Sequence, residues 1–165
     1  MLRSVTLLGS LVALSSCGPG ASAKPKYITL PVCQMAREAT GLIEAQVTAI
    51  GTTQTLSDVG QVHGGRATPV TVTVSRVMSG AAASTVWAVG EVDQDGKAEQ
   101  GNFKANGSFA SGYFFVTEFG DKTMIYGING YFRKDGSNVI NVLDPSGIPE
   151  SQFLSQASGS PPACP

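Results

Sequence analysis

Strands and turns alternate closely in residues 113–142, which read YFFVTEFGDKTMIYGINGYFRKDGSNVINV. Aromatic and β-branched residues are frequent here, and pairs of turn-forming residues interrupt them at short intervals. The turns are Gly120-Asp121, Asn129-Gly130 and Asp135-Gly136. The strands expected between and around them are residues 113–119, 122–128, 131–134 and 139–142. This spacing predicts a meander of antiparallel hairpins.

Three earlier segments also have the alternation of half-buried strands. In residues 42–50 the apolar side chains of Ile43, Ala45, Val47 and Ala49 share one face. Valines alternate with Thr and Ser in residues 70–75, and the pattern changes phase at Val77, as a β-bulge would cause. Residues 85–92 are apolar on both faces, which is typical of a central strand. Between these strands, residues 51–68 and 93–108 are expected to be loops.

The expected elements predict a mainly β fold with one short helix near its start. That helix covers residues 31–40 and ends at Gly41. Six or seven short strands favour a small antiparallel barrel of the OB type, closed or partly open, because closure removes exposed strand edges. A β-sandwich is the alternative. The domain is predicted to span residues 31–144, and residues 145–165 to form a C-terminal tail with one or two helical turns near residues 149–156.

Residues 1–23 have the pattern of an export signal. Arg3 gives a positive start, and residues 5–14 form a largely apolar run. This length falls within the roughly 7–15 residues of a signal core and is too short to span a membrane. Two cleavage sites are possible, one after Ala23 in a small-x-small pattern and one before Cys17.

The second cleavage site lies in a motif, Leu14-Ser15-Ser16-Cys17, that resembles the lipobox of bacterial lipoproteins. The resemblance implies a signal peptide of residues 1–16, lipid on Cys17 and a membrane anchor that faces outside the cytoplasm. Stable anchoring takes about two lipid signals, and lipoproteins have two or three acyl chains on one cysteine. Residues 18–23 are all small or proline, and they predict a flexible tether over residues 17–30. By the same resemblance, Gly18, in place of the aspartate of inner-membrane lipoproteins, implies the outer membrane in a cell that has two membranes; otherwise the anchor would lie in the cell membrane. Cleavage after Ala23 would instead give a soluble secreted protein.

The cysteine count is three, and either cleavage site leaves two in the folded domain. Lipidation uses Cys17, and cleavage after Ala23 removes it. Cys33 and Cys164 then remain together in an oxidising compartment, where disulfides persist. We predict that they form a disulfide that closes nearly the whole domain into one loop; two buried free thiols are the alternative.

Four short motifs give the chain a resemblance to bacterial relatives of the netrin-like module of tissue inhibitors of metalloproteinases. They are ATGLIEAQV at residues 39–47, VTVTVSRVMSG at 70–80, GYFFV at 112–116 and YFRKDG at 131–136. The resemblance implies an OB-type five-stranded barrel over residues 33–142. It does not imply metalloprotease inhibition. Those inhibitors use a free N-terminal cysteine amine, whereas the Cys17 amine would be acylated and Cys33 lies inside the chain.

Few residues are candidates for chemistry. His63 is the only histidine, and it has no nearby cysteine to complete a zinc site. Asp93 and Asp95 have the spacing of a calcium loop, but Lys97 occupies the next ligand position, so a turn is favoured. No nucleophile elbow, dinucleotide fingerprint or phosphate-binding loop occurs. The sequence therefore predicts a noncatalytic domain without metal or cofactor. An enzyme with a divergent active site is an alternative hypothesis.

The aromatic residues of neighbouring strands are the candidates for a ligand surface, with core packing as the competing interpretation. They are Trp87, Tyr113, Phe115 and Tyr131. Formal net charge is −1 and no basic cluster occurs, which argues against nucleic acid as a partner. We expect a surface-tethered domain with a binding or structural role in the cell envelope, where an envelope protein is a possible partner. The alternative is an inhibitor of an extracytoplasmic hydrolase, acting through the loop at residues 51–68.

Overall fold

The computed structural model describes residues 30–56, 65–93, 95–98, 100–105, 108–109, 111–160 and 164. The predicted signal, both of its cleavage sites, the tether up to residue 29 and His63 lie outside these residues. The elements in chain order are α1 (Val32–Glu38), β1 (Gly41–Ile50), β2 (Gln54–Thr55), β3 (Arg66–Ser79), β4 (Thr85–Val89), β5 (Lys97–Ala98), β6 (Gly101–Asn102), β7 (Lys104–Ala105), β8 (Ser108–Phe109), β9 (Ser111–Phe119), β10 (Lys122–Ile125), β11 (Tyr131–Asp135), β12 (Asn138–Ile140), β13 (Ile148–Pro149) and α2 (Glu150–Ala157).

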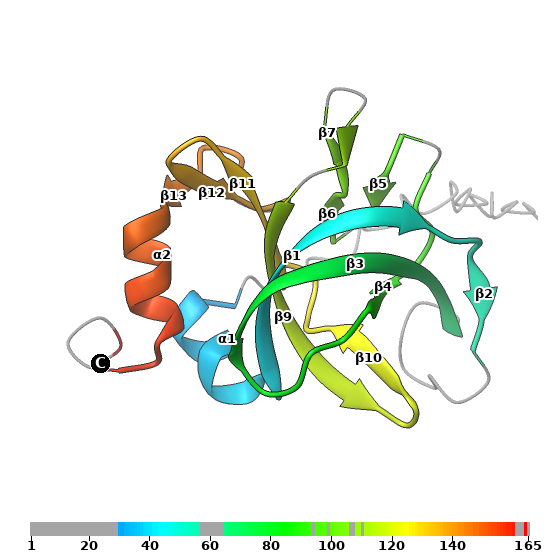
Figure 1. Ribbon diagram of the computed structural model, residues 1–165, viewed down its shortest axis with the longest axis horizontal. Coiled ribbons are helices and arrows are strands. Elements are labelled where there is room, and N and C mark those ends of the chain that lie inside the picture. The colour runs from blue at the N-terminus through cyan, green and yellow to red at the C-terminus, as the bar shows by residue number, and fades with distance from the viewer. Residues whose placement is uncertain are drawn as a thin grey trace, which may run out of the picture.

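Five strands form a closed barrel in the order β1-β3-β4-β10-β9, and pairing of β9 with β1 completes the ring (Figure 1). The prediction of a small closed OB-like barrel is therefore confirmed, and the sandwich alternative is wrong. One pairing differs from the expected antiparallel pattern, because β4 and β10 run parallel with Met124 opposite Trp87. Strand direction cannot alternate all the way around a ring with an odd number of strands, so at least one pair must be parallel.

The barrel interior is filled by the apolar positions that alternation predicts. Ile43, Val47, Val70 and Val86 are at most 1% exposed and belong to one core cluster. Ala49, expected on the same face, is exposed. It lies beyond a register shift between Val47 and Ala49. Another register shift, between Leu42 and Ile43 of β1, leaves Met78 of β3 outside the pairing. Met78 is next to Val77, where the sequence predicts a change of phase.

A second core cluster lies between the outside of the barrel and the two helices, which pack side by side (Figure 1). Met35 of α1 and Phe153 of α2 are both fully buried in it. β9 contributes to both clusters, with Phe114 facing the barrel interior and Phe115 facing the helices. This strand is therefore apolar on both faces.

Three segments expected to be loops or a tail contain further structure. β2 pairs with β3, which begins at Arg66, so the expected loop at residues 51–68 is shorter than predicted. The polar segment 93–108 contains two small hairpins, β5–β6 and β7–β8, and places Phe103 in the barrel core. Residues 148–149 form β13, which pairs with β12, and residues 150–157 form α2, where one or two helical turns were expected. The predicted tail therefore packs as part of the domain.

Candidate binding site

Three of the four aromatic residues expected to form a ligand surface are buried. Tyr113, Phe115 and Tyr131 are 1%, 0% and 1% exposed, and they divide between the two core clusters. Trp87 is half-buried, and the Lys122 ammonium lies 5.4 Å from the centre of its ring. Core packing, the competing interpretation, therefore holds for these three residues, and the four do not form one shared surface. Tyr113 and Phe115 are buried because α2 covers the outer face of β9, a contact that strand alternation cannot indicate, whereas Tyr131 packs in the barrel core.

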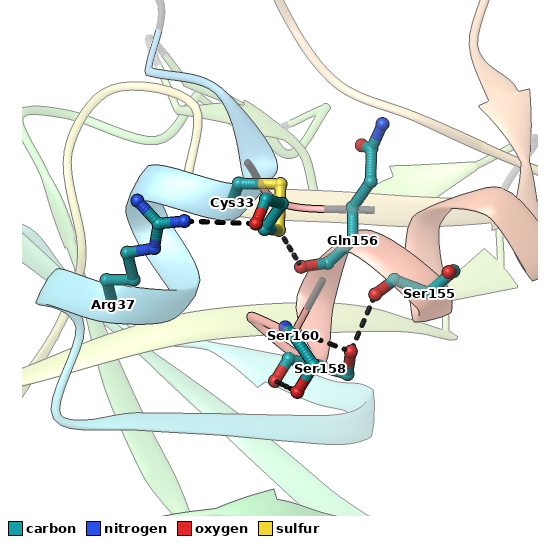
Figure 2. The surroundings of a disulfide bond; sticks show 7 residues. Cys33, Arg37, Ser155, Gln156, Ser158 and Ser160 are labelled. Carbon is teal, nitrogen blue, oxygen red and sulfur yellow. Dashed lines mark hydrogen bonds between the residues drawn. A yellow bond between two sulfur atoms is a disulfide. The ribbon is translucent and has the colours of Figure 1, made fainter. Parts of the chain in front are cut away.

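The predicted disulfide between Cys33 and Cys164 is present in the structure (Figure 2). It joins α1 to a residue 131 positions later, with a Cα–Cα distance of 5.4 Å. Arg37 of α1 also donates a hydrogen bond of 3.3 Å to the Cys164 carbonyl oxygen. Both contacts hold the end of the chain against α1.

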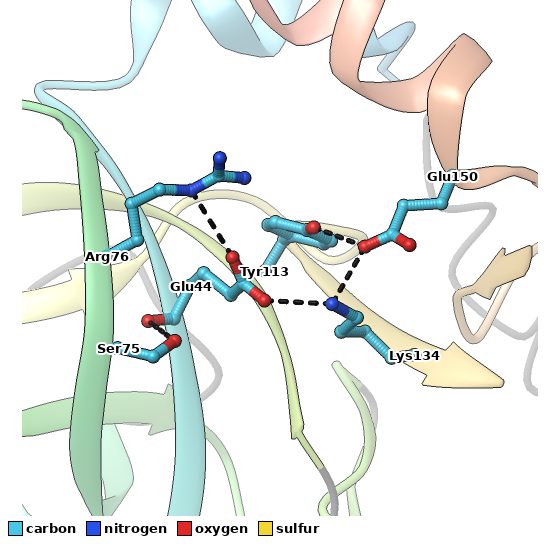
Figure 3. A network of polar contacts seen from close by, with 6 residues as sticks. All are labelled: Glu44, Ser75, Arg76, Tyr113, Lys134 and Glu150. Atoms are coloured by element: carbon cyan, nitrogen blue, oxygen red, sulfur yellow. Dashed lines mark hydrogen bonds and ion pairs between the residues drawn. The ribbon is translucent and has the colours of Figure 1, made fainter. Parts of the chain in front are cut away.

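A polar network connects β1, β3, β9 and β11 with the first residue of α2 (Figure 3). Lys134 donates to Glu44 and to Glu150, at 2.8 Å each. Tyr113 donates its hydroxyl to the same oxygen of Glu150, and the Lys134 ammonium lies 5.4 Å from the centre of the Tyr113 ring. Arg76 pairs with the other oxygen of Glu44 at 3.3 Å.

The electrostatics of this network favour a structural role. The carboxylates of Glu150 and Glu44 raise the pKa of Lys134, so its ammonium stays charged and is unavailable as a base or nucleophile. Burial, followed by the hydrogen bond to Glu150, raises the pKa of Tyr113 above its ordinary 10.0. Lys134, followed by Tyr113, lowers the pKa of Glu150 below its ordinary 4.5. Each shift favours the ionisation state that makes these contacts, which is the charged form for Lys134 and Glu150 and the neutral form for Tyr113.

We expect acid to weaken this link. Because the folded-state pKa of Glu150 is lowered, its contribution is complete above about pH 4.5 and is lost as the pH falls through the lowered value. Glu150→Gln should cost about 1 kcal/mol at pH 7, an amount kept small because the partners are partly solvent-screened. The variant should also lose less stability than wild type on acidification.

Urea denaturation at pH 7, 5 and 3 measures this difference. Glu91→Gln is the matched control, because Glu91 forms an exposed pair with Arg66 that is outside the network. Equal acid dependence of wild type and Glu150→Gln would contradict the assignment.

A hollow of about 300 Å³ lies beside the β11–β12 hairpin. Arg133 is on the same face of β11 as Tyr131, and Ile140 of β12 is paired directly with Arg133. Phe132 and Lys134 occupy the opposite face, toward α2. The second wall comes from the β5–β6 hairpin, since β6 contacts β11. Among the described residues, the hollow is lined by Lys97, Ala98, Gly101, Tyr131, Arg133, Ile140, Asn141 and Val142.

The Tyr131 ring is tightly enclosed next to this hollow. It stacks against Phe103 and Phe114, with ring centres 4.9 and 4.5 Å away. A Cβ at Gly101 or Gly112 would come within 2.8 or 2.6 Å of its ring carbons, so glycine permits this packing. The Tyr131 hydroxyl is buried without a hydrogen-bond partner among the described residues. An unsatisfied hydroxyl of this kind costs roughly 1–3 kcal/mol.

The sequence did not indicate this hollow. Alternation in residues 131–134 places Tyr131 and Arg133 on one face, but it does not show which segment faces them. The opposite wall is β5, a two-residue strand that gives no periodic signal.

Other sequence candidates remain apart from the hollow. Asp93 accepts hydrogen bonds from the backbone N–H groups of Asp95 and Lys97, at 2.9 and 2.8 Å, so this segment forms the favoured turn. Within the described residues, no cluster of three or more His, Cys, Asp or Glu side chains is placed to hold a metal. Residues 57–64 of the loop expected to inhibit a hydrolase lie outside the described part of the chain.

No protein-family model matches this chain, and no curated protein matches it in sequence.

In the ranges that the structure describes, neither helix has the length and apolar character needed to cross a membrane.

Proposed function

We propose that the protein is an exported lipoprotein, anchored outside the cytoplasm through Cys17, whose noncatalytic barrel acts as a binding module of the cell envelope. The observation that carries the export part of this proposal is the disulfide between Cys33 and Cys164. Disulfides form and persist mainly in oxidising compartments, and they are rare in the cytosol. The disulfide thus supports the export predicted from residues 1–23.

The fold and the hollow support the second part of the proposal. The closed barrel is compatible with the resemblance to netrin-like modules, but a shared fold does not identify an activity. A binding role is favoured over a purely structural one by the hollow beside β11, which presents cationic, polar and apolar side chains together. Ligand sites commonly combine apolar walls with a few polar groups.

Metabolic labelling with a fatty-acid probe tests the anchor. Wild type should incorporate the probe and fractionate with membranes, because acylation of Cys17 provides the lipid. Cys17→Ala should lose both properties. Ser22→Ala, a small change beside the alternative cleavage site, should retain them.

The N-terminal peptide provides an independent readout. An acylated peptide that begins at Cys17 supports the proposal. An unmodified peptide that begins at Lys24 would contradict lipid anchoring and favour a secreted protein. Label that persists in Cys17→Ala would contradict the assignment of Cys17.

A further inference from the structure

We propose that the hollow beside β11 binds a small amphipathic anion, a carboxylate or phosphate attached to a short apolar chain. This inference rests on the proposed role as a binding module and specifies the chemistry of its ligand. Figure 1 shows the two hairpins that form the walls, β5–β6 and β11–β12, at the same end of the barrel. The volume of about 300 Å³ is at the lower end of the roughly 300–1,000 Å³ typical of ligand pockets, which favours a small ligand.

The charges of the lining select an anion. Arg133 is about three-quarters buried, with 24% of its side chain exposed, and its guanidinium is permanently charged. Its ion-pair partner among the described residues is the exposed Asp135, at the long distance of 3.9 Å. Most of the five N–H donors of Arg133 are therefore available to a carboxylate or phosphate, which Arg binds in bidentate geometry. Lys97 adds a second positive charge at the opposite wall.

Asn141 supplies a further donor. Its side-chain oxygen accepts hydrogen bonds from the backbone N–H groups of Leu143 and Asp144, at 2.8 and 2.9 Å. These bonds fix the orientation of the amide and leave its NH₂ group for another partner. Asn141 and Arg133 both line the hollow.

The remaining lining explains the apolar part of the ligand. Ala98, Ile140 and Val142 contribute aliphatic surface, and Val142 is 40% exposed. A fully hydrated anion would leave this surface in contact with water. An alkyl chain beside the anionic group would cover it and gain favourable burial.

The test uses four probes that separate the contribution of the negative charge from that of the alkyl chain of the ligand. Hexanoate and hexyl phosphate have both features, acetate has the charge alone, and 1-hexanol has the chain alone. Each is titrated into the full-length protein carrying Cys17→Ala, which cannot be acylated at that position, and binding is followed by backbone amide NMR shifts. Hexanoate, hexyl phosphate or both should shift residues 97–98 and 140–142 and bind more tightly than acetate or 1-hexanol. The tighter of the two identifies the headgroup.

Arg133→Met should weaken binding of that probe roughly 10- to 100-fold, because a charge-assisted interaction is lost. Lys97→Met should weaken it only about two- to fivefold, since Lys97 is exposed. Arg66→Met is the matched control, because it removes an arginine charge outside the hollow. It should leave affinity unchanged.

Several results would overturn the inference. They are no shift at the lining residues, equal binding of 1-hexanol and hexanoate, or equal effects of Arg133→Met and Arg66→Met. Thermal unfolding of each variant identifies any loss that comes from misfolding, and Arg133→Lys then replaces a variant that does not fold. Its affinity should fall between those of wild type and a variant without the charge. Acylation of Cys17 is measured separately, so failure to bind these probes would leave the anchor proposal intact.

Discussion

Cys33→Ser combined with Cys164→Ser should lower the free energy of unfolding by about 4–5 kcal/mol. The bond joins residues 131 positions apart, so its loss releases a very long loop in the unfolded chain. The chain-entropy model gives roughly 4.7 kcal/mol for a loop of 100 residues and slightly more for longer ones. Replacing both cysteines avoids leaving an unpaired thiol in the buried site of Cys164.

Urea denaturation of the double variant, and of wild type with and without reductant, measures this effect. Reduced wild type should approach the double variant, whereas reductant should not change the double variant itself. A difference below about 1 kcal/mol between oxidised wild type and the double variant would show that the bond contributes little.

Phe153→Ala should cost about 3–5 kcal/mol, the usual range for removal of a fully buried aromatic side chain. Phe153 is 0% exposed, and its ring centre lies 4.8 Å from those of both Tyr113 and Phe132. Its truncation would leave a cavity between α2 and the barrel. The exposed neighbour Gln152 provides the control, because Gln152→Ala should change stability by less than about 0.5 kcal/mol.

Chemical denaturation followed by far-UV circular dichroism measures both variants. A loss below 1 kcal/mol for Phe153→Ala would indicate that α2 is only loosely attached to the barrel. A loss in the expected range would show that this segment is required for the stability of the barrel domain.

Local patterns were sufficient to predict most of the barrel. Alternation placed Ile43, Val47 and Val70 inside it, and the turn at Gly120-Asp121 separates β9 from β10. These features depend on neighbours in sequence, which periodicity and turn residues report directly. The pairing of Cys33 with Cys164 could also be predicted, because few alternatives remained once Cys17 was excluded.

Long-range contacts explain what could not be predicted. Tyr113 and Phe115 lie on a face that would be exposed on an isolated barrel, but α2 covers that face and buries them. The hollow likewise depends on the position of β5 beside β11, and no local pattern in either segment indicates that the two lie close together. Such contacts are decided by tertiary packing and not by local preference.

If the protein is exported as proposed, the separation of the bridged cysteines has a consequence for its passage across the membrane. If the chain is exported from its N-terminus, Cys33 emerges well before Cys164, and the bond must wait until the 131-residue interval has passed. Closure of the barrel waits in the same way, because β1 pairs with β9 about seventy residues later. The chain would therefore cross the membrane without this disulfide, and the bond would form only after translocation, when the barrel has folded.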